Sequence, residues 1–349
     1  MVSHSSNNVS INNISISVAF AQTALAKVPI SDDEKSNILQ QCRIPSQLLM
    51  QPSARISLRQ YGELITQLML AGKDELLGHG EQILPIGNFA IMSHFMITAK
   101  NLEHVLKRLK QYNQVMGNDL SIEIEIVADE CQVSLPKLDL ALQSQLFVYE
   151  FGLFFIHRML SWYSQSIIPI TAIELPFAAP VHARDYALVF YGAPIKFNAP
   201  RAKLSFDKRL LVKENKRGLA ALEQLLTNPI ANLLMLQFHS QSYSARVGKI
   251  LQSTLQAQIP EIPELPSLDK VAAKLNLAPY TLQRRLSDEG NSFIALKNQL
   301  KRDKAIELLA HSELSIEQIS HYLGFAETSP FTRTFKQWTG VPPSAYRKR

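Results

Sequence analysis

The sequence predicts an α+β N-terminal domain, followed by an all-α domain in which a long helix joins two helix-turn-helix units. Three observations support this fold class. Helical and strand periods alternate up to about residue 206. A proline-rich stretch then interrupts the chain at 259–266. Beyond it, a set of helical apolar patterns occurs twice within residues 265–349.

Composition and charge narrow the class of protein. The chain has 349 residues, of which 46% are apolar and 19% charged, as in a globular protein of two or three domains. Residues 265–349 carry 13 basic and eight acidic residues, whereas the whole chain carries 36 and 30. The excess of positive charge is therefore concentrated in the C-terminal quarter. A polyanion is the partner to test there.

Cys42 and Cys131 are the only cysteines, too few for a disulfide framework or a metal knuckle. No signal peptide and no uninterrupted apolar run of about 20 residues is evident. We therefore expect a soluble, cytoplasmic protein without a membrane segment. The histidines form no metal-binding motif, so neither a metal nor a cofactor is predicted.

The N-terminal domain is predicted over 17–210, after a loose tail rich in Ser and Asn at 1–16. Apolar stripes predict helices around 58–69 and 102–109. Alternation predicts a strand at 121–127, with which 131–135 could pair as a hairpin. A third strand is expected at 170–175. A short helix near 185–190 and extended pieces around Lys196 and Leu204 complete the domain.

The stretch from Leu146 to Tyr163 is rich in aromatic residues. Aromatic faces at helical spacing usually lie in a core, which favours a central core helix. The alternative is an apolar pocket for a small molecule, in which His157 or Arg158 anchors a carboxylate. The residues assigned to that pocket are Phe151, Phe155, His157, Arg158 and Trp162.

Two segments separate the domains. Residues 211–258 read as a helical connector, interrupted near Asn228 and Pro229. Pro260, Pro263 and Pro266 follow at a spacing of three. Each proline lacks an amide donor and biases the preceding residue toward extended backbone, so 259–266 is predicted to be a stiff linker.

The C-terminal domain, 267–349, contains the repeat. The segments that start at Ser267 and Ser315 align with an offset of 48. Their apolar positions follow an i, i+3, i+4, i+7 stripe, formed by Leu268, Val271, Ala272 and Leu275 and then by Ile316, Ile319, Ser320 and Leu323. The spacing predicts two helix-turn-helix motifs, at 267–289 and 315–338.

Residues at the turns support these motifs. Asn276 and Gly324 tolerate the left-handed backbone that a tight turn between helices needs. Pro279 and Pro330 suit a first helical position, the second of them with Ser329 as N-cap.

The second helix of each motif also repeats, with an offset of 49. Leu282 aligns with Phe331, Arg284 with Arg333 and Leu286 with Phe335. The apolar positions are predicted to face inward. The outward side chains are arginine, glutamine and hydroxyl residues, which hydrogen-bond base edges and phosphates in a major groove. The long helix predicted at 291–310 would hold the two recognition helices about one DNA turn (~34 Å) apart.

Residues 265–349 closely resemble the DNA-binding domain of the AraC/XylS family of bacterial transcription regulators. The resemblance is carried by APYTLQRRL from Ala278, by the pattern of Arg302, Ala305, Leu308 and Leu309, by the segment 319–340 and by VPPSAYR from Val341. It implies DNA contacts by Tyr280, Thr281, Gln283 and Arg284, by Thr328, Ser329, Thr332 and Arg333, and by Lys336 as a phosphate contact. Ala278 stands where the family commonly has a capping serine. This difference is expected to lower the stability of the helix that follows by about 1 kcal/mol.

Most of residues 17–210 resemble the effector domain, called arabinose-binding, of one branch of this family. The best local match is YGAPIKFNAPRAKLSF from Tyr191. The resemblance implies a sequence-specific regulator, an activator, that acts as a homodimer on double-stranded promoter DNA in the bacterial nucleoid. By the same resemblance it contacts RNA polymerase and is controlled by an unknown small molecule.

Two alternatives belong to other classes of function. In the first, the protein is a constitutive regulator and its N-terminal domain only dimerises. In the second, it is an enzyme or a small-molecule carrier with an incidental basic tail. The second needs a polar catalytic set within 17–210, and the sequence shows none.

Overall fold

The computed structural model describes residues 14–236, 243–255 and 264–347. Most of the predicted tail at 1–16 and the first five residues of the predicted linker at 259–266 lie outside this part of the chain. The chain divides into two compact units. The larger unit comprises residues 17–42 and 61–238, and the smaller comprises residues 1–16, 43–60 and 239–349.

A five-stranded sheet with the strand order β3-β4-β7-β5-β6 forms one part of the larger unit. The strands are β3 (Glu123–Val127), β4 (Glu130–Ser134), β5 (Ile170–Glu174), β6 (Ile195–Lys196) and β7 (Lys203–Asp207). β3 and β4 pair as the predicted hairpin, with Val127 opposite Glu130. β5 is antiparallel to β7 and parallel to β6. The strands expected from alternation and around Lys196 and Leu204 are therefore confirmed.

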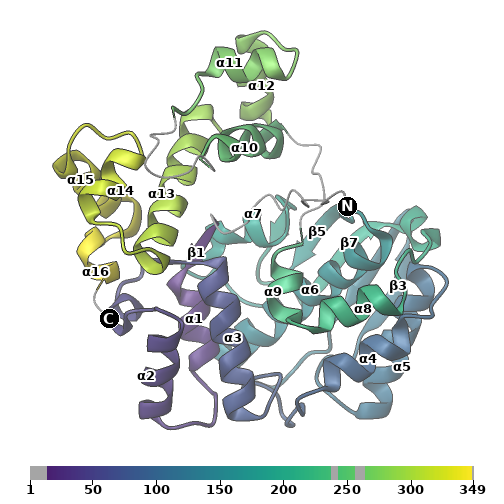
Figure 1. The fold of residues 1–349 in the computed structure, drawn as a ribbon. Helices are drawn as coiled ribbons and strands as arrows, with labels where there is room; N and C mark the ends of the chain where they lie inside the picture. The colour runs from purple at the N-terminus through teal and green to yellow at the C-terminus, as the bar shows by residue number, and fades with distance from the viewer. Residues whose placement is uncertain (1–13, 237–242, 256–263, 348–349) are drawn as a thin grey trace, which may run out of the picture. The chain divides into compact units, whose positions relative to one another are not determined.

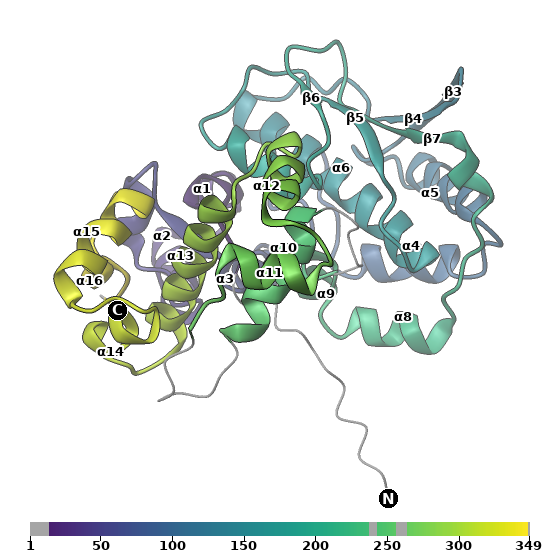
Figure 2. The ribbon, with the colours of Figure 1, turned by 90° about the horizontal axis from the view of Figure 1, so that it is seen from above.

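Helices fill the rest of the larger unit, and Figure 2 shows α5 and α6 on one side of the sheet. They are α1 (Val18–Leu25), α2 (Asp32–Gln41), α3 (Leu58–Gly72), α4 (Asn88–Met96), α5 (Leu102–Met116), α6 (Leu142–Ser164), α7 (Tyr186–Val189), α8 (Leu219–Leu226) and α9 (Pro229–Leu234). α6 is the aromatic helix. Its 23 residues span about 34 Å, and it is mostly buried, as a central core helix requires.

The smaller unit contains the repeat. Its helices are α10 (Tyr243–Thr254), α11 (Leu268–Lys274), α12 (Pro279–Asp288), α13 (Phe293–His311), α14 (Ile316–Tyr322), α15 (Thr328–Thr339) and α16 (Pro343–Arg347). In Figure 1, α13 runs from the pair α11–α12 to the pair α14–α15. The two predicted helix-turn-helix motifs and the long helix between them are confirmed.

The turns of the two motifs use the expected residues. Asn276 has φ 55° and Gly324 has φ 75°, so both adopt the left-handed backbone. Pro279 begins α12 with Ala278 as its N-cap, and Ala278 supplies no capping side chain. The second motif differs from the prediction: Glu327, not Ser329, is the N-cap of α15, and the helix begins one residue before Ser329.

The smaller unit also includes residues from much earlier in the chain. The short helix η1 (Ser46–Met50) and the strand β2 (Arg55–Ser57) belong to it, and β2 pairs with β1 (Ser15–Ser17). α10 belongs to it as well, although the sequence placed this helix in a connector at 211–258. Among the described residues, no helix is both long and apolar enough to cross a membrane.

Candidate nucleic-acid interface and apolar cavity

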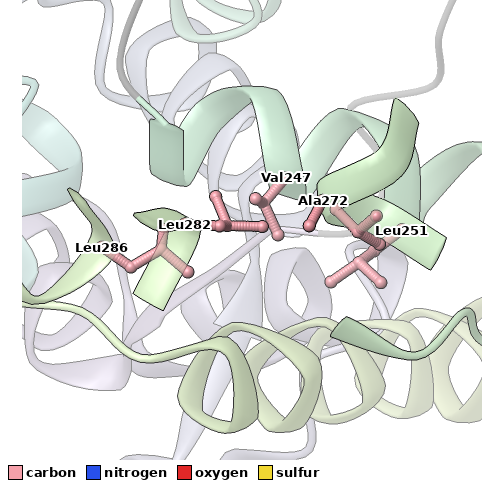
Figure 3. Packing of buried hydrophobic residues seen from close by; sticks show 6 residues of the cluster. Val247, Leu251, Ala272, Leu282 and Leu286 are labelled. Atoms are coloured by element: carbon pink, nitrogen blue, oxygen red, sulfur yellow. The ribbon is translucent and has the colours of Figure 1, made fainter. Parts of the chain in front are cut away.

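The first recognition helix, α12, is amphipathic. Leu282 and Leu286 are fully buried and join Val247 and Leu251 of α10 and Ala272 of α11 in one core cluster (Figure 3). The opposite face of α12 is open. Tyr280 is 75% exposed there, Gln283 and Arg284 are also exposed, and Thr281 is half-buried.

The second recognition helix, α15, has the same arrangement with larger core residues. Phe331 and Phe335 are fully buried, and their ring centroids lie 5.7 Å apart. On the outer face, Ser329, Arg333 and Lys336 are exposed, while Thr328 and Thr332 are half-buried. Arg284 and Arg333 therefore occupy equivalent outward positions in the two motifs, as the offset of 49 predicts.

The environment of Arg284 differs from that of the neighbouring Arg285. The Arg285 guanidinium lies over the Tyr243 ring of α10, 5.7 Å from its centroid. In the described part of the chain, the guanidinium groups of Arg284 and Arg333 have neither an ion pair nor a hydrogen bond. A free, exposed guanidinium keeps all five donors for a base edge or a phosphate.

Residues 43–60 support the second motif through direct hydrogen bonds. The Tyr346 hydroxyl of α16 accepts a hydrogen bond from the Arg55 amide (3.0 Å) and donates one to the Arg55 carbonyl (2.8 Å). Gln47 donates to the Ala345 carbonyl at 2.7 Å, and Ser53 donates to the Thr339 carbonyl at 3.3 Å. These bonds join α15 and α16 to a segment nearly 300 residues earlier in the sequence.

Gly340 ends α15 against this segment. Its φ is +76°, a backbone conformation that residues with a side chain rarely adopt. A Cβ at this position would lie 1.8 Å from Ser53 Oγ, so the Ser53 hydroxyl, which donates to the Thr339 carbonyl, would have to rotate away.

Asp303 is the buried acid of α13, with 2% of its surface exposed. It accepts hydrogen bonds from Ser15 Oγ (2.5 Å) and Arg302 Nε (2.9 Å). Burial raises the pKa of Asp303, although the charges of Arg302 and Arg55 act in the opposite direction. Arg55 also donates to Ser15, so a connected polar network joins β1, β2 and α13.

The larger unit contains a cavity of about 390 Å³. Residues of α3, α4, α5, α6, α8 and α9 and of the segments between them line it, and most of them are apolar. They include Met69, Leu84, Leu109, Phe151, Phe155 and Leu233. Two further lining residues, Leu70 and Ile86, are 53% and 45% exposed. The cavity therefore has an apolar wall and exposed apolar side chains at its edge. Its volume lies within the range found for small-molecule sites.

Glu75 is the charged residue in this cavity wall. Its two carboxylate oxygens accept hydrogen bonds from the amides of Gly87 (2.8 Å) and Phe89 (2.9 Å), at the start of α4. Burial raises the pKa of Glu75, although these hydrogen bonds and one from the Asn88 side chain act to lower it. Glu75 therefore serves as the cap of α4, whose preceding residue, Gly87, has no side chain to do so.

The five residues predicted for an effector pocket separate into two groups. Phe151 and Phe155 line the cavity, on one face of α6 with Gly152 and Ile156. His157, Arg158 and Trp162 do not line it. The sequence shows that α6 has several apolar faces, but it does not show which of them lines a cavity.

The other three residues have contacts of their own. His157 is fully buried, its Nε2 lies 2.8 Å from the Ile168 carbonyl oxygen, and desolvation followed by the charge of Arg158 lowers its pKa to about 3. The Arg158 guanidinium lies over the rings of Phe154 and Tyr191, at 4.8 and 4.3 Å from their centroids. Trp162 lies under the guanidinium of Arg217, at 5.0 Å.

Sequence reasoning missed the residues that α3 and α9 contribute to the cavity, such as Thr66, Met69 and Leu233. Met69 lies on the predicted apolar stripe of α3, but periodicity does not distinguish a filled interface from a cavity. Within the described ranges, no three His, Cys, Asp or Glu side chains are placed to hold a metal ion. Cys42 and Cys131 are buried free thiols, and desolvation raises the pKa of each to about 12.

Comparison with known proteins agrees with this architecture. Residues 34–215 match the family model described as the arabinose-binding domain of AraC transcription regulators, and residues 271–349 match a helix-turn-helix domain model. The chain is 25% identical over 341 residues to the ornithine utilization regulator of Pseudomonas aeruginosa, covering 95% of this chain and 96% of the relative.

Two further proteins of the same organism are similar. The regulator VqsM is 24% identical over 282 residues, covering 75% of this chain and 80% of the relative. The crystal structure of the regulator CdpR aligns over 91% of this chain and 97% of its own, with 19% identity and a TM-score of 0.33. With a matching family model over more than half of its length and a second one over the repeat, the chain belongs to the AraC family of DNA-binding transcription regulators.

Proposed function

We propose that the protein is a sequence-specific transcription activator that reads double-stranded promoter DNA with α12 and α15. The observation that carries this proposal is the equivalent placement of Arg284 and Arg333, both exposed and without protein partners in the described residues, above fully buried core positions. Tyr280, Thr281, Gln283, Thr328, Ser329 and Thr332 would complete the base and phosphate contacts, and Lys336 would contact phosphate.

The DNA-binding part is tested with the full-length chain and an operator selected from a random DNA pool. Arg284→Ala and Arg333→Ala are expected to lose about 1–3 kcal/mol of operator binding and to relax specificity at one base position each. Lys336→Ala should weaken operator and random DNA alike and reduce the salt slope by about 1. Arg209→Ala, an arginine of the larger unit whose side chain is 84% exposed, is the matched control.

The outcome that rejects base reading is an equal loss of affinity on operator and random DNA for both arginine variants. Such a result would make Arg284 and Arg333 phosphate contacts. Activation itself is measured by transcription in vitro with bacterial RNA polymerase. Repression, or no change in transcript level, would contradict the activator role.

We further propose that a small molecule bound in the N-terminal cavity controls the regulator, which acts as a homodimer. The cavity supports this because its volume of about 390 Å³ matches small-molecule sites. A ligand that binds one arrangement of the protein better than another would shift the operator affinity. The full-length relative is named for ornithine utilization, so ornithine is the first polar metabolite to test beside arabinose.

Ligand control is distinguished from the constitutive alternative by a thermal-shift screen of the full-length protein against bacterial metabolites. A true effector raises the free energy of unfolding by about 2.7 kcal/mol at 100 times its Kd, and it changes operator affinity. If no ligand changes operator affinity, and the protein still activates transcription, the N-terminal domain acts constitutively. Sedimentation of the same protein tests the homodimer.

A further inference from the structure

The cavity of the larger unit allows a sharper statement about the class of ligand, one that rests on the proposed effector control. We propose that this cavity takes a compact, uncharged and predominantly apolar molecule, and not a sugar, although the family model is named for arabinose. What the cavity can bind depends on which atoms of its wall are free to form hydrogen bonds with a ligand.

The apolar part of the wall offers no directional contact. Phe151 and Phe155 of α6 are ring neighbours, with centroids 6.3 Å apart, and the Phe89 ring meets Phe155 edge to face at 5.2 Å. Leucine, isoleucine and methionine side chains from α3, α5 and α9 complete the wall. Such a surface binds by shape and by removal of apolar area from water, so it favours ligands with little polar surface.

The polar side chains of the wall are already partnered within the protein. Asn113 donates to the Leu120 carbonyl at 2.7 Å and accepts from the Asn118 amide at 3.1 Å. Thr66 Oγ1 donates to the Gly62 carbonyl at 2.9 Å, one turn earlier in α3. Thr227 Oγ1, at the edge, donates to the Gln224 carbonyl at 2.8 Å.

Asn88 and Glu75 are partnered in the same way. Asn88 Oδ1 accepts from the Tyr112 hydroxyl at 2.8 Å, and the Glu75 carboxylate caps α4 as described above. Among the residues that line the cavity, none has a buried polar side-chain atom without a hydrogen-bond partner. The polar side chains of the wall are thus already engaged within the protein, and only their remaining hydrogen-bonding capacity is open to a ligand.

This distribution disfavours polar ligands. A sugar would bring several hydroxyl groups into a mostly apolar space whose few polar side chains are already partnered, and each buried polar group without a partner weakens binding by roughly one to two orders of magnitude. A carboxylate would meet the like charge of Glu75 and no cation. An amine could pair with Glu75 only by competing with the amides of Gly87 and Phe89, on which α4 depends.

The edge of the cavity fits the same ligand class. Leu70 of α3 and Ile86, which precedes α4, are large apolar side chains that are about half exposed to solvent. Exposed apolar side chains that adjoin an apolar cavity are typical of ligand-binding surfaces.

The experiment uses the full-length protein and the neutral fluorescent probe N-phenyl-1-naphthylamine. After the probe has bound, it is displaced by decanol, decanoate and decylamine, which share a chain length and differ in head group, and by L-arabinose. We expect decanol to displace the probe at a concentration at least tenfold lower than decanoate or decylamine. Arabinose should not displace it.

Two variants tie the probe to this cavity. Ile230→Trp fills it from α9, where Ile230 is half-buried, and should weaken probe binding at least tenfold without changing the melting temperature. Ile91→Trp, at a position of α4 that is 65% exposed and does not line the cavity, is the matched control and should bind the probe as the wild type does.

Several outcomes would overturn the inference. Absence of probe binding, preferred displacement by decanoate or decylamine, or displacement by arabinose would each do so, as would equal binding by Ile230→Trp and the wild type. Operator affinity is measured in parallel to separate this inference from the proposed function. If decanol binds and no ligand of any class changes operator affinity, effector control fails and the ligand class stands. If a polar metabolite alone changes operator affinity, the ligand class fails and effector control stands.

Discussion

The first helix-turn-helix motif, α11–α12, packs against α10, whereas the second, α14–α15, is bonded to residues 43–60 through α15 and α16. The inner faces of α12 and α15 correspond position by position. Their supports come from different parts of the chain. The first motif rests on an apolar cluster that includes Val247 and Leu251, only about 20 residues before it. The contacts between residues 43–60 and α15 and α16 include four hydrogen bonds that each involve a main-chain group.

This difference shows that two motifs with repeated sequences need not be stabilised by equivalent contacts with the rest of the protein. Apolar contact tolerates small shifts, because it depends on buried area. Hydrogen bonds such as those between Tyr346 and Arg55 require a defined geometry. The second motif should therefore depend more sharply on single polar atoms, and the first on side-chain volume.

The largest effect is expected when residues 43–60 are absent. A fragment of residues 243–349 keeps α10 but loses, among other contacts, five hydrogen bonds from residues 43–60: those of Arg43, Gln47 and Ser53 and the two between Arg55 and Tyr346. At about 1 kcal/mol per bond, the second motif should be destabilised by on the order of 5 kcal/mol. Trp338, the only tryptophan of this fragment, reports unfolding of α15 by fluorescence.

A synthetic peptide of residues 43–60, added to this fragment, is the control. It should restore part of the stability in proportion to its concentration, while a scrambled peptide should not. If both motifs of the fragment unfold together, and at the wild-type temperature, the two supports are not distinct.

The next largest effect should fall on the first motif alone. Leu251→Ala removes a fully buried side chain from the cluster of α10, α11 and α12 and is expected to cost about 2–5 kcal/mol. Hydrogen exchange should then quicken in α11 and α12 and remain slow in α14 and α15. Ser253→Ala, two residues later and exposed, should change neither motif. Equal acceleration in both motifs would contradict the comparison.

A smaller effect is expected when one oxygen atom is removed, the hydroxyl oxygen of Tyr346 in α16. Tyr346→Phe leaves the Arg55 amide and carbonyl without the hydroxyl that now bonds to both, at a cost of about 1–3 kcal/mol. Exchange should quicken in α15 and α16, while α11 and α12 keep their protection. A variant with wild-type protection in α15 and α16 would show that these two bonds do not fasten the motif.

The Tyr346 hydroxyl should also make the stability of the protein depend on pH in the alkaline range. Burial raises the pKa of Tyr346 from its ordinary value of 10 to about 12, so the folded protein holds this proton more tightly than the unfolded chain does. The contribution of this proton to the free energy of unfolding is fully present below pH 10. It is lost as the pH rises toward 12, at about 1.4 kcal/mol per pH unit. The difference in stability between wild type and Tyr346→Phe should narrow over that range. A constant difference would contradict a buried, neutral hydroxyl.

The smallest effect concerns the starts of the two recognition helices. Neither Ala278 of α12 nor Glu327 of α15 supplies a capping hydrogen bond, whereas Ser267 and Ser315 cap α11 and α14. Ala278→Ser should stabilise α12 by about 1 kcal/mol. Thermal unfolding measures the gain, and Ala278→Gly, expected to gain less, is its control. No gain from serine would mean that the first turn of α12 cannot use a cap.

Local patterns in the sequence predicted the parts of this fold that depend on neighbours in the chain. The stripes of α11 and α14, the hairpin of β3 and β4, and the left-handed turns at Asn276 and Gly324 all follow from spacing or from single residue types. The N-cap of α15 was missed by two residues, because Ser329 is a better cap by type than Glu327 and type alone does not fix the start of a helix.

Features that depend on distant pairs were not predictable. Residues 43–60 carry no periodic signal that points to α13, α15 or α16, and α10 reads as a connector until its partners in α11 and α12 are known. For the cavity, the sequence assigned Phe151 and Phe155 of α6 to a pocket. It equally allowed the faces of His157, Arg158 and Trp162, because an opening is a property of several elements together.

The hydrogen bonds of Tyr346 with Arg55 join residues 291 positions apart, which affects how the protein is made. At about 5–20 residues per second, a ribosome needs roughly 15–60 s to reach Tyr346 after it has added Arg55. For nearly all of that interval, η1 and β2 have been synthesised but α15 and α16 have not. The surface of residues 43–60 that later holds the second motif is thus uncovered on every nascent chain, where a chaperone or a neighbouring chain can reach it before the protein's own C-terminal helices do.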